Sequence, residues 1–167
     1  YGYEMSTLID VHSHVFPPKI APAVLENLEE NLGLVAPLDG TLEDLTASLD
    51  EHDIDRSVAL GAAPEPRQVD GINEFLDEVH EETNGRVVPF YTVHPHYEGM
   101  AEELERLKKQ GAKGIKVHSL FQDIDPSDPC MYPIYEVCDD DLAVLIHGGP
   151  PATPDAFARI LEQFPDL

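Results

Sequence analysis

The sequence has few basic residues, few cysteines and no long apolar run. Ten Lys and Arg stand against 33 Asp and Glu among its 167 residues, which gives a formal net charge of -23. A field of this sign repels phosphate backbones, so nucleic acid is not an expected partner. No segment approaches the ~20 apolar residues that cross a bilayer, so no membrane partner is expected either.

The two cysteines, Cys130 and Cys138, lack Cys-x-x-Cys spacing, and no secretory signal precedes them. We therefore expect free thiols in a reducing compartment and a cytoplasmic protein. The acidic residues are dispersed over predicted helix faces, as in residues 26–30 and 102–105. This dispersal, with only five lysines, favours a protein adapted to high salt over a merely acidic cytosolic protein, because salt screens the self-repulsion.

Short apolar runs alternate with amphipathic segments along the whole chain. The runs predict strands near residues 7–12, 56–61, 87–93, 113–118 and 143–147. Helical spacing and capping residues predict helices at 22–31, 41–49, 69–79, 100–107 and 132–139, and from Thr153–Pro154 onward. A loop is predicted for residues 119–131. Residues 15–40 form a long insertion, which we expect to lie over the strand carboxyl ends as a lid.

Strict alternation of strands and helices indicates an α/β fold with a parallel sheet and helices outside it. An open doubly wound sheet and part of a (β/α)8 TIM barrel both fit this pattern. The Gly-rich dinucleotide fingerprint does not follow the first strand, and histidines gather at strand carboxyl ends, where barrel active sites lie. We predict an incomplete (β/α)8 barrel of about five sequential strand–helix units over residues 7–167, after an N-terminal extension at residues 1–6.

Histidines at the strand ends carry the candidate chemistry. Side chains alternate faces along a strand, so His12 and His14 point the same way, and His147 points inward from the fifth strand. The same parity turns Lys116 and His118 inward on the fourth strand. The alternate apolar positions should face the outer helices: Ile9, Val11, Ile115, Val117, Val144 and Ile146. Converging imidazoles would repel each other if protonated, and a divalent cation, most simply zinc, resolves this because it binds neutral imidazole.

Each of these residues also has a simpler explanation. A lone His-x-His pair is often two ordinary polar loop residues. Lys116 fits a lysine paired with a neighbouring carboxylate equally well, and His118 fits a hydrogen-bonded interior histidine. The combination of His12, His14 and His147 on two strands with the right parity favours the metal site.

The sequence resembles the amidohydrolase superfamily in three motifs: Ile9-Asp10-Val11-His12-Ser13-His14, Gly114-Ile115-Lys116-Val117-His118 and Val144-Leu145-Ile146-His147-Gly148-Gly149. It is similar to the amidohydrolase-related branch, which contains metal-dependent hydrolases and non-oxidative decarboxylases. The resemblance covers essentially the whole chain from Thr7 to Leu167. It implies a (β/α)8 barrel that holds a divalent metal, usually zinc.

Carried over residue by residue, the resemblance makes His12, His14 and His147 metal ligands. Lys116 stands on the strand where two-metal members carry a carbamylated bridging lysine, and His118 is a possible substrate contact there. The family's sixth-strand histidine and its eighth-strand aspartate, which is the general base, have no counterpart in these residues. We therefore expect the base beyond the last residue, a longer parent protein, and a homodimer as one assembly of that complete protein.

The leading functional hypothesis is a metal-dependent hydrolase that uses a zinc-activated water on a small amide, ester or lactone. The substrate would lie under residues 15–40 and 119–131, with Phe16, His94 and Arg67 as predicted contacts, although Arg67 also fits an ordinary surface arginine. The alternatives are a non-oxidative decarboxylase of a small aromatic or unsaturated carboxylic acid, and a non-catalytic half-barrel.

Overall fold

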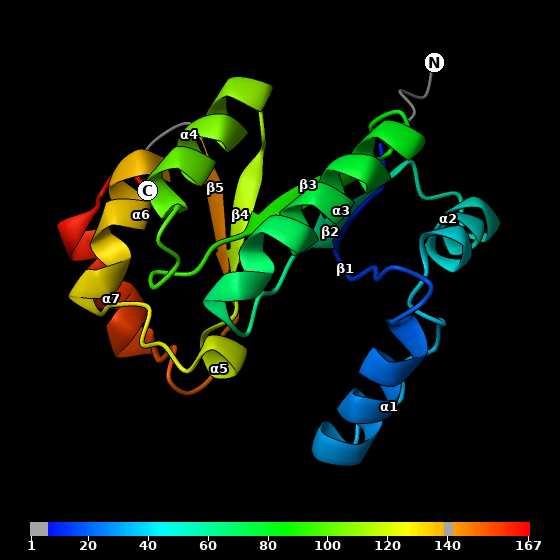
Figure 1. The fold of residues 1–167 in the computed structure, drawn as a ribbon, viewed down its shortest axis with the longest axis horizontal. Coiled ribbons are helices and arrows are strands. Elements are labelled where there is room, and N and C mark those ends of the chain that lie inside the picture. Colours follow the sequence, from blue (N-terminus) through cyan, green and yellow to red (C-terminus); the bar gives the residue numbers. More distant parts are fainter. Residues whose placement is uncertain (1–6, 139–141) are drawn as a thin grey trace, which may run out of the picture. The chain divides into compact units, whose positions relative to one another are not determined.

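Figure 1 shows the computed structural model, which describes residues 7–138 and 142–167. The chain forms two compact units. One takes in the residues up to Ala59 together with Glu78–Val88, and the other consists of Leu60–Asp77 and Pro89–Leu167. The predicted extension at residues 1–6 and the predicted helix end at Asp139 lie outside the described residues.

The strands are β1 (Ile9–Ser13), β2 (Arg56–Leu60), β3 (Val87–Thr92), β4 (Gly114–Val117) and β5 (Ala143–Ile146). They follow the order β1-β2-β3-β4-β5 in one sheet, as predicted. β1 runs parallel to β2, β3 to β4, and β4 to β5. A doubly wound sheet would reverse its strand order, so the sequential order confirms an α/β fold of the incomplete (β/α)8 barrel type.

The predicted helices are α1 (Ala21–Leu32), α2 (Leu42–Glu51), α3 (Val69–Glu82), α4 (Met100–Gln110), α6 (Tyr132–Cys138) and α7 (Pro154–Gln163). The hydroxyls of Thr41 and Thr153 cap α2 and α7 by accepting hydrogen bonds from main-chain N–H groups. The structure adds a short helix, α5 (Ser119–Gln122), where the sequence predicts a loop. It also has 3-10 turns at Pro66–Gln68 and Pro129–Met131. Within residues 7–138 and 142–167, no helix is long and apolar enough to span a bilayer.

In the first unit, hydrogen bonds close the loops around β1 and β2. The Arg86 guanidinium donates to the Asp50 carboxylate at 2.5 Å and to the Ile54 carbonyl at 3.0 Å, which ties the start of β3 to the end of α2. The Phe16 N–H donates to the Gly40 carbonyl at 2.8 Å and closes the base of the 15–40 insertion. The insertion leaves the carboxyl end of β1 and contains α1 (Figure 1). Its role as a lid stays a prediction.

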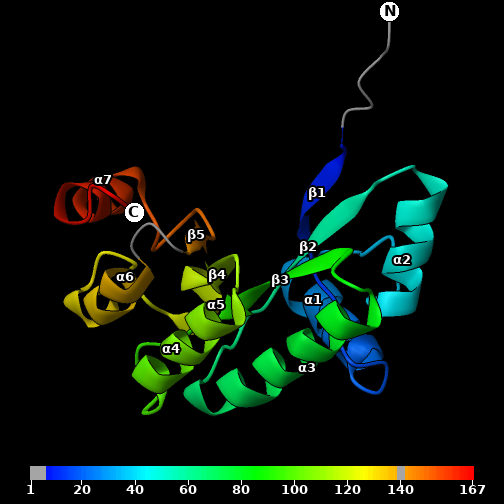
Figure 2. The same ribbon diagram turned by 90° about the horizontal axis from the view of Figure 1, so that it is seen from above.

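The second unit has a core on one face of β4 and β5. Ile115 and Val117 are fully buried there among side chains of α4, α6 and α7, and Val144 and Ile146 pack against the same cluster. Figure 2 shows these helices flanking the two strands. The outward parity predicted for β4 and β5 is therefore confirmed. Close strand packing also explains Gly114, where an added Cβ would lie 2.5 Å from the Phe90 ring.

The side chains of β1 that the sequence predicts to face the outer helices are not buried. Ile9 and Val11 are 46% and 62% exposed, so they do not pack beneath helices as the sequence analysis expects. β1 is the edge strand of the described sheet, and the described elements leave this side of it largely uncovered. Alternation assigns a face to a side chain, but burial needs an element to cover that face.

A buried polar network joins α3, β3 and α4 in the second unit. The Asn73 amide accepts a hydrogen bond from the Thr92 N–H at 2.9 Å and donates to Glu103 at 2.7 Å. The Arg106 guanidinium donates to both Glu103 oxygens at 2.7 Å and to Asp77 at 2.9 Å. Burial opposes ionisation of Glu103, but the hydrogen bonds from Arg106 and Asn73 outweigh it and lower the pKa of that carboxyl. The network fixes both helices against the strand that leads to His94.

Candidate functional site

Lys116 is the fully buried member of the candidate site. It sits on β4 between the two outward-facing residues of the core, so its side chain points to the opposite face. The side chain is fully buried, and its Nζ atom has no hydrogen-bond partner among the described residues. Burial lowers the pKa of this ammonium. A buried nitrogen without a partner is costly, so an anion or a covalent modification would satisfy it. The predicted alternative, a carboxylate partner, is not found within residues 7–138 and 142–167.

His147 follows β5 directly and is held by its main chain. Its N–H donates to the Val117 carbonyl at 2.9 Å, and its carbonyl accepts a hydrogen bond from the Ser119 hydroxyl at 2.8 Å. Burial, and then the charge of Lys116, lower the pKa of His147. A lowered pKa favours the neutral ring, which is the form that binds a metal ion.

His118 connects His147 to α5 through stacked rings. The ring centroids of His118 and His147 lie 4.1 Å apart, and those of His118 and Phe121 lie 3.9 Å apart. The Nδ1 atom of His118 accepts the Phe121 N–H at 3.4 Å, so a neutral His118 ring carries its proton on Nε2. The structure thus brings three of the predicted site residues, Lys116, His118 and His147, to the carboxyl ends of β4 and β5.

His12 and His14 lie together at the carboxyl end of β1 in the first unit. Their ring centroids are 5.3 Å apart in an edge-on arrangement, as the shared face predicts, and both residues are exposed. The intervening Ser13 points the other way, and its hydroxyl donates to the Val58 carbonyl at 3.0 Å. This bond fixes the end of β1 against β2.

The predicted substrate contacts have varied surroundings. The His94 ring is buried, and its Nδ1 accepts the His96 N–H at 3.2 Å, so it acts first as an interior hydrogen-bonding group. Phe16 packs near Gly40 at the base of the insertion. Arg67 has an 80% exposed side chain and forms an ion pair with Glu65 at 2.6 Å, as the surface alternative describes. A role in substrate binding stays a prediction for all three.

The predicted metal ligands are divided between the two units, with His12 and His14 in one and His147 in the other. Among the residues that the structure describes, no group of three or more His, Cys, Asp or Glu side chains is placed to hold a metal ion. The three-histidine site therefore stays a prediction. The chemistry of the donors fits a metal, because the lowered pKa of His147 favours its neutral ring and its main chain is bonded on both sides.

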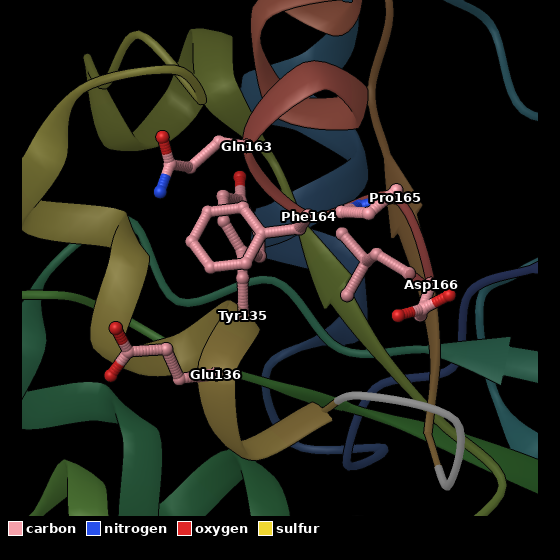
Figure 3. Close-up of a pocket in the computed structure, with 7 residues that line it drawn as sticks. Tyr135, Glu136, Gln163, Phe164, Pro165 and Asp166 are labelled. Carbon is pink, nitrogen blue, oxygen red and sulfur yellow. The ribbon is translucent and has the colours of Figure 1, made fainter.

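A pocket of about 200 Å³ lies elsewhere in the second unit. Figure 3 shows its lining, which comes from α6, from the last residue of α7 and from the chain after it: Tyr135, Glu136, Gln163, Phe164, Pro165, Asp166 and Leu167. The Tyr135 and Phe164 rings meet edge-on with centroids 5.4 Å apart. None of the candidate site residues lines this pocket, so it is not the candidate site.

Two residues that support the site were missed by sequence reasoning, Ser119 and Gln122. Both belong to α5, a segment for which the sequence predicts a loop. The available signal was two polar residues three positions apart that flank an apolar pair directly after the fourth strand. Such spacing places both side chains on one face of a helical turn.

The amidohydrolase family model matches residues 9–167 of this sequence. The chain belongs to the amidohydrolase family. Among curated proteins, none matches the sequence. The resemblance stated from the three motifs is therefore confirmed at the level of the family.

Solved structures support the fold of this amidohydrolase. IDCase from Metarhizium anisopliae superposes with a TM-score of 0.71 at 18% identity, over 96% of this chain and 63% of the other. A probable 2-pyrone-4,6-dicarboxylic acid hydrolase from Acinetobacter baumannii superposes with a TM-score of 0.60 at 17% identity, over 96% of this chain and 55% of the other. A manganese-bound 5-carboxyvanillate decarboxylase from Novosphingobium aromaticivorans superposes with a TM-score of 0.68 at 19% identity, over 96% of this chain and 56% of the other. This amidohydrolase thus spans about three fifths of the length of these proteins.

Proposed function

We propose that this chain carries part of the active site of a metal-dependent hydrolase that acts on a small amide, ester or lactone. A divalent metal, with zinc as the first choice, would be held by His12, His14 and His147. The observation that carries the proposal is the placement of His147, which follows β5 with its main chain bonded on both sides, where burial lowers the pKa of its ring. A fixed, neutral imidazole is what a zinc ligand requires.

When bound, the metal would supply Lewis-acid polarisation at the reacting oxygen of the substrate. Lys116 bears directly on this chemistry, because a bare ammonium beside His147 would repel a cation. Carbamylation by CO2 would convert the Lys116 amine into an anionic carbamate. This group would attract the metal, and the buried nitrogen would no longer carry a positive charge. His118, with its proton on Nε2, would hold a hydrogen-bond donor toward the substrate beside the same ring stack.

A non-oxidative decarboxylase of a small aromatic or unsaturated acid is the second candidate, and Lys116 is also the observation that favours it. A substrate carboxylate would supply the anion that the buried ammonium lacks among the described residues. The exposed ion pair of Arg67 with Glu65 makes this arginine a weaker candidate for that task. Solved relatives of both reaction types share the fold.

Metal content after loading with Zn2+ and exhaustive dialysis tests the proposal. We expect the chain to retain zinc and the His12→Ala and His147→Ala variants to lose most of it. His52→Ala is the matched control, because His52 ends α2 and its ring bonds to the Ser48 carbonyl at 2.9 Å. Equal zinc retention in all four proteins would rule out the assignment.

Product analysis separates the two reactions. The zinc-loaded chain is incubated with a panel of lactones, esters and amides, and separately with hydroxybenzoic acids. Acid release from the first panel supports the hydrolase, and CO2 release from the second supports the decarboxylase. Lys116→Arg keeps a cation but cannot form a carbamate, so it should abolish a carbamate-dependent hydrolase more completely than a decarboxylase that needs a cation.

A further inference from the structure

The short helix α5 presents a buried polar face to the ends of the strands. Ser119 and Gln122, at its two ends, are 0% and 6% exposed, whereas Leu120 and Phe121 between them are 51% and 37% exposed. Residues three apart lie on one face of a helical turn. An apolar pair that faces outward and a polar pair that faces inward is the reverse of ordinary core packing, so the polar pair needs an explanation.

The Gln122 side chain forms hydrogen bonds with three main-chain groups that lie just beyond the strands. Its Nε2 donates to the Ala63 carbonyl at 3.2 Å and to the Val93 carbonyl at 2.5 Å, and its Oε1 accepts the His118 N–H at 2.9 Å. These groups follow β2, β3 and β4, where the ladder bonds between strands have ended. Buried main-chain groups are seldom left unpaired, so one amide here replaces ladder bonds for three strands.

Ser119 likewise forms a hydrogen bond with the main chain just beyond the fifth strand. Its hydroxyl donates to the His147 carbonyl at 2.8 Å, next to the ladder bond from the His147 N–H to Val117. The two side chains of α5 thus bond to the main chain after β2, β3, β4 and β5. All of these residues belong to the second unit.

We propose that α5 is a brace and that Ser119 and Gln122 are positioning residues for the candidate site. Ser119 sets the direction of His147 through its carbonyl, and Gln122 sets His118 through its N–H and His94 through the preceding Val93. The stacked rings of His118 and His147 then keep the spacing that the brace imposes. The consequence for metal binding rests on the proposed function, whereas the effect on ring geometry does not.

Zn2+ affinity, measured by competition with a chelator, tests the consequence for metal binding. Loss of a group that orients a ligand typically weakens metal binding 10–100-fold, so we expect at least a tenfold loss for Ser119→Ala. Ser119→Thr keeps the hydroxyl and should restore the affinity to within about threefold of the wild type. Ser127→Ala is the matched control, because the hydroxyl of this buried serine bonds to Asp125 at 2.7 Å and to Arg159 at 2.9 Å, and neither partner belongs to a strand. Equal losses for Ser119→Ala and Ser127→Ala would overturn the proposal.

Ring geometry in the metal-free chain tests the brace independently of any metal. Stacking on Phe121 displaces the NMR shifts of the His118 ring protons, and stacking on His118 displaces those of His147. Ser119→Ala should therefore move the His147 shifts, and Gln122→Met should move the His118 shifts. Ser127→Ala should leave both sets in place. If ring shifts change as expected but the wild type binds no Zn2+, the proposed function fails and the brace stands. Unchanged shifts in a folded Ser119→Ala variant overturn the brace itself.

Discussion

The buried ammonium of Lys116 leads to a prediction about stability. Lys116→Met replaces it with an apolar side chain of similar length, which removes the cost of burying a charge that has no hydrogen-bond partner among the described residues. Replacing buried ion pairs by apolar side chains of similar volume has stabilised proteins by about 1–4 kcal/mol, and the Lys116 ammonium lacks even a partner that would offset its burial. We expect a gain in that range at pH 7, or roughly 2–4 °C in Tm for each kcal/mol in a chain of this size.

The sign of the pH dependence follows from the direction of the Lys116 pKa shift. The folded protein holds this proton less tightly than the unfolded chain, so the unfolded state binds more protons below the ordinary lysine pKa of 10.5. The stability of the wild type must therefore rise with pH as the ordinary value is approached from below. The advantage of Lys116→Met should be largest at neutral pH and should shrink toward pH 10.

Thermal unfolding followed by circular dichroism at 222 nm, at pH 7 and pH 10, measures both effects. A chelator and CO2-depleted buffer keep the Lys116 amine free of metal and carbamate. Lys113→Met is the control, because Lys113 is exposed just before the same strand and its loss should change the stability by less than about 0.5 kcal/mol. A Lys116→Met variant that is less stable than the wild type, or a gap that is equal at both pH values, would refute the reasoning.

Further predictions concern the packing and charge of the chain, and urea unfolding measures each of them. Arg106→Ala should cost about 2–3 kcal/mol because it leaves the Glu103 carboxylate buried without its bidentate partner, whereas Arg67→Ala should cost less than about 1 kcal/mol because its ion pair is exposed. Equal costs would contradict the role of burial. Gly114→Ala should cost about 1–3 kcal/mol, since its Cβ would lie 2.5 Å from an aromatic ring, while Gly71→Ala, with open space around it in α3, should stabilise by up to about 1 kcal/mol. The net charge of -23 predicts that stability falls as salt is removed, and a midpoint that does not move between 0.05 M and 2 M NaCl would exclude salt adaptation.

Much of this architecture could be predicted from local sequence patterns. The five strands, their sequential order and the helices capped by Thr41 and Thr153 all follow from periodicity and capping. The shared face of His12 and His14 and the inward turn of Lys116 follow from the twofold alternation of a strand. The three histidine motifs were also sufficient to identify the family that the comparison confirms.

Tertiary structure decided the features that depend on neighbours far away in the sequence. Periodicity could not show that Ile9 and Val11 stay exposed, because burial requires a covering element. It could not show that Lys116 lacks a carboxylate partner in the described chain, since a partner for a buried charge can come from any segment. The role of Gln122 was hidden for the same reason: its amide bonds to Ala63 and Val93, which are 59 and 29 residues away. Alternation and capping are properties of a few adjacent residues, whereas the pairing of buried polar groups is settled only when distant strand ends meet.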